Sequence, residues 1–415
     1  MSSKKKNGRI KPRQIVLLIG SLEFGGAGKM YLQLAEYFKF QGIGISLCLM
    51  DRTIEMISNG GEGDQSIEIL GFLPSRSPTW YKIFIFPLQY IRFCRMVRRK
   101  NPDLVLSFME RANIMNLLLL FPSVKRIISV RTSFSTRMTL KSPLKRFFLR
   151  MIYPVLLHRA HDINLNSKGS RESFISYFGL PPGRTSMIHN FCDLEGSGHH
   201  GSLPPSYDRV YEKNVVVAGG RLVREKGFGH LIRAFRWILD KHGDGRLVII
   251  GDGPNRIILE RLALKMGVGD RVFFPGFQRR VAPWIASARV FVLPSLVEGF
   301  PNMLLEAMSL GCPVIAADCP SGPGEILQRA FTGVGDTLRY ADYGVLIPAL
   351  SGHQYHRTPD LDAGEKYLVK AVCHLLDSDE LRYHYGRLGK VRAEHFSRGR
   401  RGKKWMELID RVCNP

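Results

Sequence analysis

Short apolar runs alternate with segments of helical length through both halves of this 415-residue chain. Alternation of this kind is typical of βαβ units that build a parallel sheet. The runs of the first half are residues 15–19, 45–50, 104–107, 126–130, 163–166 and 185–188. Those of the second half are 215–218, 247–250, 272–274, 290–293 and 314–317. The chain is therefore predicted to have an α/β fold with two doubly wound, Rossmann-like domains.

A stretch rich in glycine and proline separates the two series, and this is the composition of a linker. Residues 328–362 show no clear period and are interpreted as a loop-rich insertion before a helical C-terminus. The predicted organisation is a basic tail at 1–13, an N-terminal domain at 14–195, a linker at 196–213, a C-terminal domain at 214–390 and a helix at 391–415 that can pack back on the N-terminal domain.

The chain carries 60 Lys and Arg against 36 Asp and Glu, a formal net charge of +24, and most of the excess lies in its N-terminal half. Such a surplus attracts phosphates of nucleic acid, of anionic lipid or of a diphosphate-bearing substrate, although it can also serve solubility alone. The seven cysteines form no C-x-x-C pair, so neither a disulfide framework nor a zinc site is indicated. No apolar run approaches the ~18 residues of a membrane span.

Two segments of the N-terminal half are basic and amphipathic. Each segment has two interpretations: a helix that lies on an anionic membrane surface, or an ordinary packed helix with a solvated basic face. Together with the charge, they predict a cytoplasmic protein that is peripherally associated with the inner face of the cell membrane. The residues that define the basic faces are Arg92, Arg95 and Arg99 after Pro87, and Arg146 and Arg150 within 145–153.

Residues 295–308 place two carboxylates beside a helix start. Glu298 follows a strand, and a helix is expected to begin near Asn302, a good N-cap residue, and to end before Gly311. Glu306 then lies in the early turns of this helix, so both carboxylates can face one cleft. Ionised carboxylates accept hydrogen bonds from sugar and ribose hydroxyls, each contributing about 1.5–3 kcal/mol. Loop N–H groups at the helix start suit a diphosphate; exposed charges that merely flank a helix are the alternative.

Two cations follow the first strand of the second series. The strand leads into Gly220 and Arg221, and Lys226 comes five residues later. Fixed cations on a glycine-containing turn at the carboxyl end of a parallel strand favour a diphosphate site, although many such charge runs are solvated turns. The Gly-Asp-Gly-Pro sequence at 251–254 is a weaker signal, and a tight turn without a ligand explains it equally well.

Together these segments resemble the retaining glycosyltransferases of family 4, whose GT-B fold consists of two Rossmann-like domains facing each other across a cleft. The resemblance is carried by the E-x7-E spacing of Glu298 and Glu306 around Gly-Phe-Pro, by the Gly-Arg-Leu-x-x-Glu-Lys-Gly run, by Gly-Asp-Gly-Pro and by residues 316–326. It extends over nearly the whole chain and is strongest over 215–326. The members that the chain resembles are bacterial surface-glycan glycosyltransferases.

The resemblance implies a role for each matching residue. Glu298, Arg221 and Lys226 are the implied catalytic residues: the carboxylate contacts the transferred sugar and the two cations bind the donor diphosphate. Glu306 is implied to hold the ribose hydroxyls, and Phe277 to lie near the base. The implied donor-binding set is Glu306, Gly25, Gly26, Gly220, Phe277, Gly299, Phe300, Pro301 and Asn302.

The acceptor side departs from the family pattern in two places. Gly28, after the glycine-rich residues 24–27, stands where relatives often carry a glutamate. Residues 129–133 stand where many members carry a histidine, and they contain none. The acceptor-binding candidates are Arg131, Ser133 and Asn113, with Ser107 beside the last of them.

The sequence therefore predicts transfer of a sugar from a nucleotide-diphosphate donor, a UDP-sugar, with retention of configuration, to a glycan acceptor linked to a polyprenyl diphosphate. No cofactor and no metal ion are expected, because fixed cations replace the ion at the leaving phosphate. A sugar-nucleotide epimerase or phosphorylase of the same architecture is the first alternative. A nucleic-acid-binding protein is the second, but no RRM-, OB- or KH-like motif accompanies the charge, so nucleic acid is not an expected partner.

Overall fold

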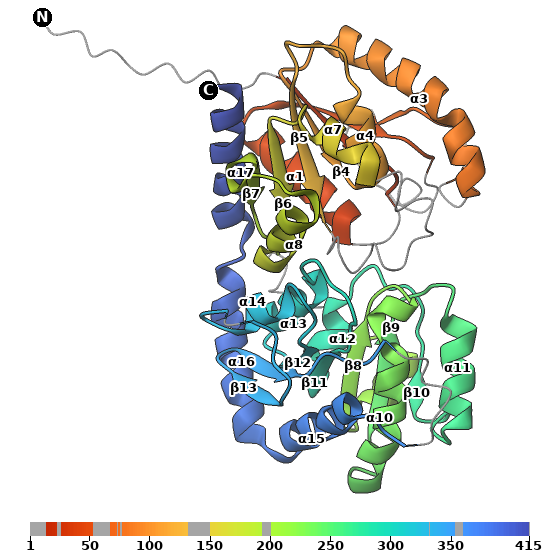
Figure 1. Cartoon of the computed structure of the whole chain (residues 1–415). Helices are drawn as coiled ribbons and strands as arrows, with labels where there is room; N and C mark the ends of the chain where they lie inside the picture. Colours follow the sequence, from red (N-terminus) through yellow and green to blue (C-terminus); the bar gives the residue numbers. More distant parts are fainter. Residues whose placement is uncertain are drawn as a thin grey trace, which may run out of the picture. The chain divides into compact units, whose positions relative to one another are not determined.

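The computed structural model describes residues 14–22, 26–52, 67–72, 74, 77–131, 150–192, 201–331, 333–352 and 360–414. The chain divides into two compact units (Figure 1). The first unit contains Met1–Asn166, Arg171–His189 and Gly399–Pro415, and the second contains Ser167–Ser170 and Asn190–Arg398. The C-terminal segment thus belongs to the first unit, although it follows the whole of the second in sequence.

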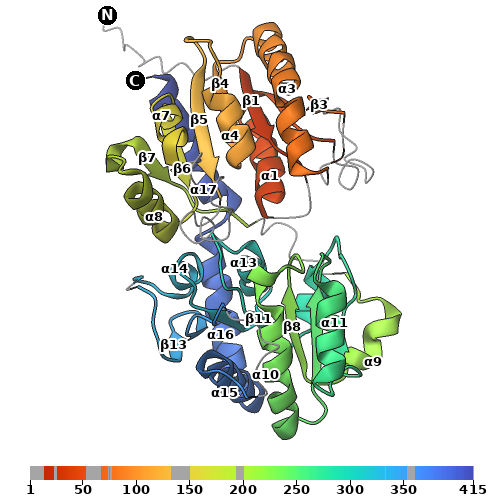
Figure 2. The same ribbon diagram turned by 45° about the vertical axis from the view of Figure 1, so that its right-hand side comes forward.

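The first unit is built on a seven-stranded sheet with the order β3-β2-β1-β4-β5-β6-β7, and every pair of neighbouring strands is parallel. In Figure 2 the labelled strands β7, β6, β5, β4, β1 and β3 follow one another across the sheet in this order. The predicted parallel sheet is confirmed, but the short edge strand β3 escaped prediction because three half-buried residues carry no readable period. The strands are β1 (Gln14–Ile19), β2 (Gly44–Leu49), β3 (Ile67–Ile69), β4 (Leu104–Phe108), β5 (Lys125–Val130), β6 (Asp162–Leu165) and β7 (Thr185–Met187).

Helices cover both faces of this sheet, because alternate side chains of each strand point to opposite faces. Val16 and Leu18 of β1 pack in the cluster that includes residues of α3 and α4, whereas the hydroxyl of Tyr31 in α1 donates to the carbonyl of Leu17 at 2.9 Å. The helices are α1 (Gly26–Phe40), α3 (Thr79–Lys100), α4 (Glu110–Leu117), α7 (Tyr153–Leu157), α8 (Lys168–Phe178) and the 3₁₀ turn η1 (Pro182–Arg184).

The last helix, α17 (Arg398–Cys413), completes the first unit. Gly402 lies against the ring of Tyr37 in α1, where a Cβ atom would come within 2.3 Å of the ring. Arg411 donates to Oδ2 of Asp162 at 2.9 Å, and Trp405 is fully buried. The boundary predicted at residue 391 falls inside α16 (Asp379–Glu394), so the helix that packs on the first unit begins later than expected.

The second unit has a seven-stranded sheet with the order β10-β9-β8-β11-β12-β14-β13, which is parallel except for β13. The interpretation of residues 328–362 as a loop-rich insertion is wrong in one respect: most of the described residues there are loop, but β13 and β14 lie among them and belong to the sheet. β14 is a fully buried strand of four residues whose apolar run was not singled out in the sequence. The strands are β8 (Val215–Gly219), β9 (Arg246–Ile250), β10 (Val272–Phe273), β11 (Val290–Leu293), β12 (Val314–Ala317), β13 (Arg339–Ala341) and β14 (Gly344–Ile347).

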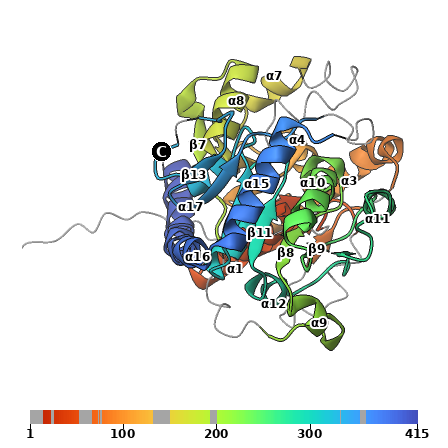
Figure 3. The ribbon, with the colours of Figure 1, turned by 90° about the horizontal axis from the view of Figure 1, so that it is seen from below.

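Two apolar clusters divide the second unit between the faces of its sheet. Val216 and Ala218 of β8 belong to one cluster, with α10, α11 and α15, whereas Val215 and Val217 belong to the other, with α12 and α13. Figure 3 shows α10 and α15 side by side. The remaining helices are α10 (Phe228–Lys241), α11 (Arg256–Lys265), α12 (Ala282–Ala286), α13 (Asn302–Ser309), α14 (Pro323–Leu327) and α15 (Ala363–Asp377), with the 3₁₀ turn η3 (Arg224–Lys226).

The predicted linker at 196–213 is folded in its described part, residues 201–213. It contains the 3₁₀ turn η2 (Pro205–Tyr207) and the short helix α9 (Asp208–Tyr211). The Tyr211 hydroxyl donates to the carbonyl of Trp284 at 2.9 Å, and the Tyr207 ring packs against the Trp284 ring. Aromatic packing therefore attaches this segment to the second unit, which its glycine and proline content did not reveal.

Candidate active site

The loops that carry the predicted catalytic residues follow two neighbouring strands of the second sheet, β8 and β11. The helices after these strands lie on opposite faces: α10 packs in one apolar cluster and α13 in the other. The chain therefore changes direction between β8 and β11, and the two loops diverge at the carboxyl edge of the sheet. In doubly wound sheets this is the position where ligands bind.

Lys226 and Glu298 meet at this point. Nζ of Lys226 lies 2.5 Å from Oε1 of Glu298, and the Ser295 hydroxyl donates to the same oxygen at 2.7 Å. The side chain of Glu298 is 9% exposed and that of Lys226 is 26% exposed. A carboxylate this deeply buried requires a counter-charge or hydrogen bonds. The structure thus brings together one predicted cation and one predicted carboxylate.

Close backbone contact holds the two loops in place. The N–H of Leu296 donates to the carbonyl of Glu225 at 2.8 Å. Gly227 has a φ of +66°, and a Cβ atom at this position would lie 1.9 Å from the carbonyl oxygen of Pro294. Only glycine tolerates both the left-handed backbone and this approach. Gly227, the last glycine of the Gly-Arg-Leu-x-x-Glu-Lys-Gly run, is therefore required by packing between the two loops.

The Gly-Asp-Gly-Pro turn supports the same edge from the neighbouring strand β9. The N–H of Gly220 donates to the carbonyl of Ile250 and the N–H of Leu222 to that of Asp252, each at 2.9 Å. A Cβ atom on Gly251, whose φ is +129°, would lie 2.0 Å from the carbonyl oxygen of Gly220. These contacts explain the glycine by loop packing, which is the ligand-free alternative considered for this motif.

The start of α13 differs from its prediction in one detail. Pro301 is the N-cap residue and makes no side-chain capping bond, and Asn302 is the first helical residue. The Nδ2 group of Asn190 instead donates to Oδ1 of Asn302 at 2.7 Å and to the carbonyl of Phe300 at 3.2 Å. Gly299, Phe300 and Pro301 are all buried. The predicted loop is thus fixed by Asn190, a residue that no motif singled out.

Two further residues behind Glu298 were not predicted. The Ser321 hydroxyl donates to the carbonyl of Glu298 at 2.6 Å. Cys319 is buried, and this burial, together with the nearby Glu298 charge, raises the pKa of its thiol. The thiol therefore stays protonated and serves as packing. Both residues lie in the segment 316–326 of the resemblance, so its order along the chain was the available signal.

The other predicted donor residues lie on the same loops or on neighbouring elements. Arg221 and Gly220 belong to the turn after β8, and Arg221 is exposed. Glu306 is half-buried in α13. Phe277 is 40% exposed and follows Gly276, whose carbonyl accepts from the N–H of Gly251 at 2.9 Å. The loops after β8, β9 and β10 are therefore joined through their backbones.

The predicted acceptor residues are placed differently. Arg131 is 6% exposed, with its guanidinium over the rings of Phe108 and Trp405, and burial lowers its pKa to about 9. Asn113 is 1% exposed and donates to the carbonyl of Ser129 while accepting from the Ser107 hydroxyl. These residues hold the interior of the first unit together and do not offer their polar groups to solvent. Gly26 begins α1; Gly25 and Ser133 lie outside the described residues.

A strained turn follows β4 at the equivalent edge of the first sheet. Met109, which immediately precedes α4, has a φ of +73°, a conformation that costs a side chain other than glycine about 1–2 kcal/mol. Arg111, in the first turn of α4, makes a bidentate ion pair with Asp51 at 2.6 and 3.2 Å and also donates to Gln89 at 3.2 Å. Sequence patterns could not have indicated the backbone conformation of Met109.

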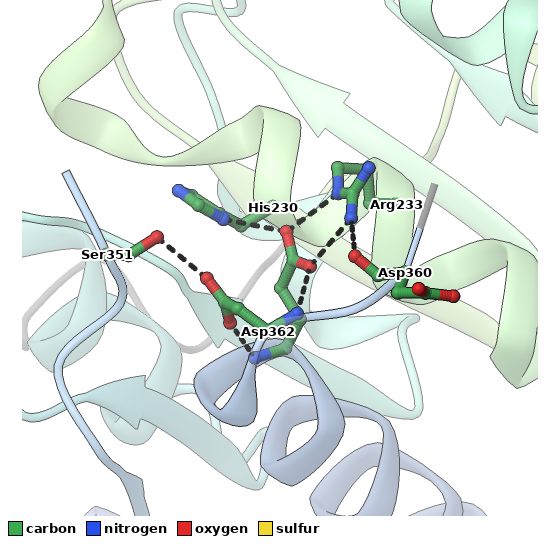
Figure 4. Close-up of polar contacts among 6 residues, drawn as sticks. His230, Arg233, Ser351, Asp360 and Asp362 are labelled. Carbon is green, nitrogen blue, oxygen red and sulfur yellow. Dashed lines mark hydrogen bonds and ion pairs between the residues drawn. The ribbon is translucent and has the colours of Figure 1, made fainter. Parts of the chain in front are cut away.

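One cluster of potential metal ligands occurs in the described part of the chain, formed by His230, Asp362 and Glu365. Hydrogen bonds within this cluster and to Arg233 join α10 to the start of α15 (Figure 4). Glu365 lies 2.8 Å from Nδ1 of His230 and accepts from Nε of Arg233 at 2.9 Å, while Asp362 caps α15 through the N–H of Glu365. The Arg233 guanidinium already neutralises the carboxylate, so this donor set suits helix packing better than a cation.

Two family models match the chain. The model of glycosyl transferases group 1 matches residues 203–335, and the model of Glycosyltransferase Family 4 matches residues 24–195. Between them they span most of both units. The first contains the loops of Lys226 and Glu298, and the second contains the strained turn at Met109.

Curated relatives cover most of the chain at modest identity. An uncharacterized glycosyltransferase of Methanocaldococcus jannaschii is 27% identical over 84% of this chain and 89% of its own length. The N-acetylgalactosamine-N,N'-diacetylbacillosaminyl-diphospho-undecaprenol 4-alpha-N-acetylgalactosaminyltransferase of Campylobacter jejuni is 25% identical over 78% of this chain and 80% of its own length.

Solved structures share the fold. Sucrose-phosphate synthase from Thermosynechococcus elongatus superposes with a TM-score of 0.76 at 19% identity, covering 96% of this chain and 99% of its own. HepE from Anabaena, in complex with UDP and glucose, superposes with a TM-score of 0.74 at 17% identity, covering 96% of this chain and all of its own.

Proposed function

Because this chain is a glycosyltransferase of the family 4 type with the GT-B fold, we propose that it transfers a sugar from a nucleotide-diphosphate donor, with retention of configuration, to a glycan acceptor. The observation that carries this proposal is the Lys226–Glu298 pair, 2.5 Å apart at the carboxyl edge of the second sheet. A cation suited to phosphate and a carboxylate suited to sugar hydroxyls are adjacent there, as the two ends of a nucleotide sugar require.

In this proposal the cations stabilise the leaving diphosphate. Lys226 and Arg221, both on the turn after β8, neutralise the negative charge that grows on the phosphate as the bond to the sugar breaks. Glu298 accepts hydrogen bonds from the sugar, and Ser295 holds the carboxylate in place through its 2.7 Å hydrogen bond. Glu306 binds the ribose hydroxyls and Phe277 contacts the base.

The proposed reaction needs no cofactor and no divalent ion. Fixed cations at a partly buried site perform the electrostatic work that a metal ion performs elsewhere. We expect turnover to be unchanged by a chelator such as EDTA, with a metal-dependent glycosyltransferase assayed in parallel. A loss of activity that added Mg²⁺ or Mn²⁺ restores would contradict this part of the proposal.

For the donor we propose a UDP-sugar, and for the acceptor a glycan linked to a polyprenyl diphosphate at the cytoplasmic face of a membrane. The solved HepE complex contains UDP, and the name of the Campylobacter relative describes a diphospho-undecaprenol-linked sugar. The excess of basic residues in the N-terminal half suits an acceptor that carries a diphosphate.

A UDP-release assay across common nucleotide sugars, with and without lipid-linked acceptor, tests this function. We expect release from one donor to rise strongly only when acceptor is present, and NMR of the product to show the donor's anomeric configuration. Release of UDP and an altered sugar without any acceptor would favour the epimerase alternative. An inverted linkage would refute retention while leaving the transferase proposal intact.

A further inference from the structure

The helix α3 exposes a continuous row of large apolar side chains. Its buried face consists of Phe93, Met96 and Val97, with Gln89 beside them. On the opposite face the fractional exposure ranges from 44% at Leu88 to 81% at Phe84. We call this row the α3 stripe; it consists of Trp80, Ile83, Phe84, Leu88 and Ile91.

The stripe was hidden from sequence analysis by Pro87, which was expected to precede the helix. The helix in fact begins at Thr79 and continues through Pro87, which is itself exposed. Positions 80, 84, 87 and 91 follow one another at the spacing of a helical turn and so share one face. At ~1.5 Å per residue, the apolar part is about 16 Å long.

Basic residues continue the same face toward the end of the helix. Arg95, Arg98 and Arg99 are exposed, and Arg99 is paired with Glu68 at 2.6 Å. Arg95 and Arg98 line a shallow pocket together with Ile91 and Phe121. The 22 residues of α3 include no Asp or Glu. The face is therefore apolar at one end and cationic at the other, with no acidic side chain of its own.

We propose that the α3 stripe inserts into an anionic lipid bilayer, with Arg95 and Arg98 at the phosphate level. This deepens the proposed function, on which the choice of a membrane partner partly rests. Apolar side chains in the acyl region, a tryptophan at the interface and arginines at lipid phosphates are the features of a helix that lies in the membrane plane. Within the described residues, no helix is long and apolar enough to cross a bilayer.

The surface next to α3 has the same character. The Tyr90 hydroxyl donates to the carbonyl of Leu118 at 2.8 Å, which fixes the loop that carries Leu120, and Leu120 is 72% exposed. A second copy of the chain suits this face less well, because α3 offers no acidic side chain to pair with the arginines of the other copy, which in an antiparallel pair would cover apolar side chains. Charge therefore favours anionic lipid over self-association.

Vesicle sedimentation of the full-length protein tests the proposal. We expect binding to anionic phosphatidylglycerol vesicles at 0.1 M salt, weaker binding at 1 M salt, where the Debye length falls to about 3 Å, and little binding to phosphatidylcholine. Phe84→Ser with Ile91→Ser in one chain should lower the partition coefficient at least tenfold at both salt concentrations. Arg95→Gln with Arg98→Gln should remove mainly the salt-sensitive part.

Phe40→Ser is the matched control, because Phe40 is 87% exposed on α1, outside the stripe. It should bind vesicles like the unmodified protein. Quenching of tryptophan fluorescence by brominated lipid should be reduced in Trp80→Phe, which reports insertion directly. Unchanged circular dichroism and melting temperature would show that the variants are folded.

Three results would overturn the proposal: no binding to anionic vesicles at low salt, equal binding of the Phe84/Ile91 variant, or concentration-dependent dimerisation that this variant abolishes. The proposed reaction is tested separately by UDP release with a water-soluble acceptor analogue, since the stripe contains none of the proposed donor-site residues. Vesicle binding without any UDP release would refute the enzymatic proposal and leave the docking surface standing.

Discussion

The two units share a strand order over five strands, β3-β2-β1-β4-β5 in the first and β10-β9-β8-β11-β12 in the second, but the edges of their sheets differ in chemistry. After β8 and β11 the second unit places an ion pair in which Glu298 is buried and Lys226 is 26% exposed. After β5 the first unit places Arg131, buried between two aromatic rings. The same topology thus supplies an ion pair at the sheet edge in one unit and a buried stabilising contact in the other.

This difference shows that the position of a cation along a Rossmann-like sheet does not define its function. A guanidinium that is 6% exposed and stacked on Phe108 and Trp405 contributes to packing. An ammonium that is 26% exposed beside a carboxylate can exchange its partner for a phosphate. Substitutions that separate activity from stability test this difference between the two units.

The largest effect is expected at the turn after β8. Lys226→Ala and Arg221→Ala should each lower turnover at least 100-fold, because each removes a fixed charge where negative charge develops on the leaving phosphate. Arg224→Ala is the matched control: Arg224 belongs to the same turn, but its guanidinium is hydrogen-bonded to the carbonyl of Gly352. Near-normal steady-state rates in both Lys226→Ala and Arg221→Ala would show that the diphosphate does not bind at this turn.

The two carboxylates of the second unit form a matched pair for the next experiment. Glu298→Ala should lower kcat roughly 10- to 100-fold, because its contact to the sugar strengthens as the bond breaks. Glu306→Ala should instead weaken UDP affinity about tenfold, because a ribose contact is equal in the ground and transition states. Steady-state kinetics and calorimetric UDP titration distinguish the two, and the opposite pattern would exchange their assignments.

Arg131→Met tests the structural interpretation of the first unit. We expect the free energy of unfolding to fall by about 2 kcal/mol, because two cation–π contacts and a hydrogen bond to Asn164 are lost, with unchanged UDP affinity. Arg52→Met, at an exposed arginine of the same unit, is the control for denaturant unfolding. Unchanged stability together with a raised KM for acceptor would support the prediction that Arg131 binds the acceptor.

The smallest effect is expected at Met109. Replacement by glycine removes the cost of a positive φ with extended ψ, about 1–2 kcal/mol, but adds a similar entropy cost to the unfolded chain, so stability should change by less than ~1 kcal/mol. Asn101→Gly is the comparison, because Asn101 has a φ of +42° and lies in the αL region, which asparagine tolerates. A large loss of stability in a urea titration would show that the Met109 side chain, not its backbone, supports the turn.

Sequence reasoning recovered strands that stand out as apolar runs between helical segments, and missed edge strands without such a run. Residues 290–293 and 314–317 were predicted with the boundaries that β11 and β12 have. β3 and β13 contain no continuous apolar run, and both lie at sheet edges, where pairing with a neighbour decides the structure. Pro87 misled the helix assignment, because proline on an exposed face removes a single backbone donor and leaves the helix intact.

By itself, the sequence determined the α/β class, the two-unit organisation, the loops that carry Arg221, Lys226 and Glu298, and the helix that carries Glu306, because alternating apolar runs and glycine turns are local properties. Only the tertiary structure decided that Lys226 and Glu298 are partners, that Asn190 and Ser295 support the site, and that Arg131 and Asn113 are buried. It also decided that the α3 stripe faces solvent. Burial and pairing depend on which distant segments cover a residue, and this coverage is not encoded in the residue's own neighbourhood in the sequence.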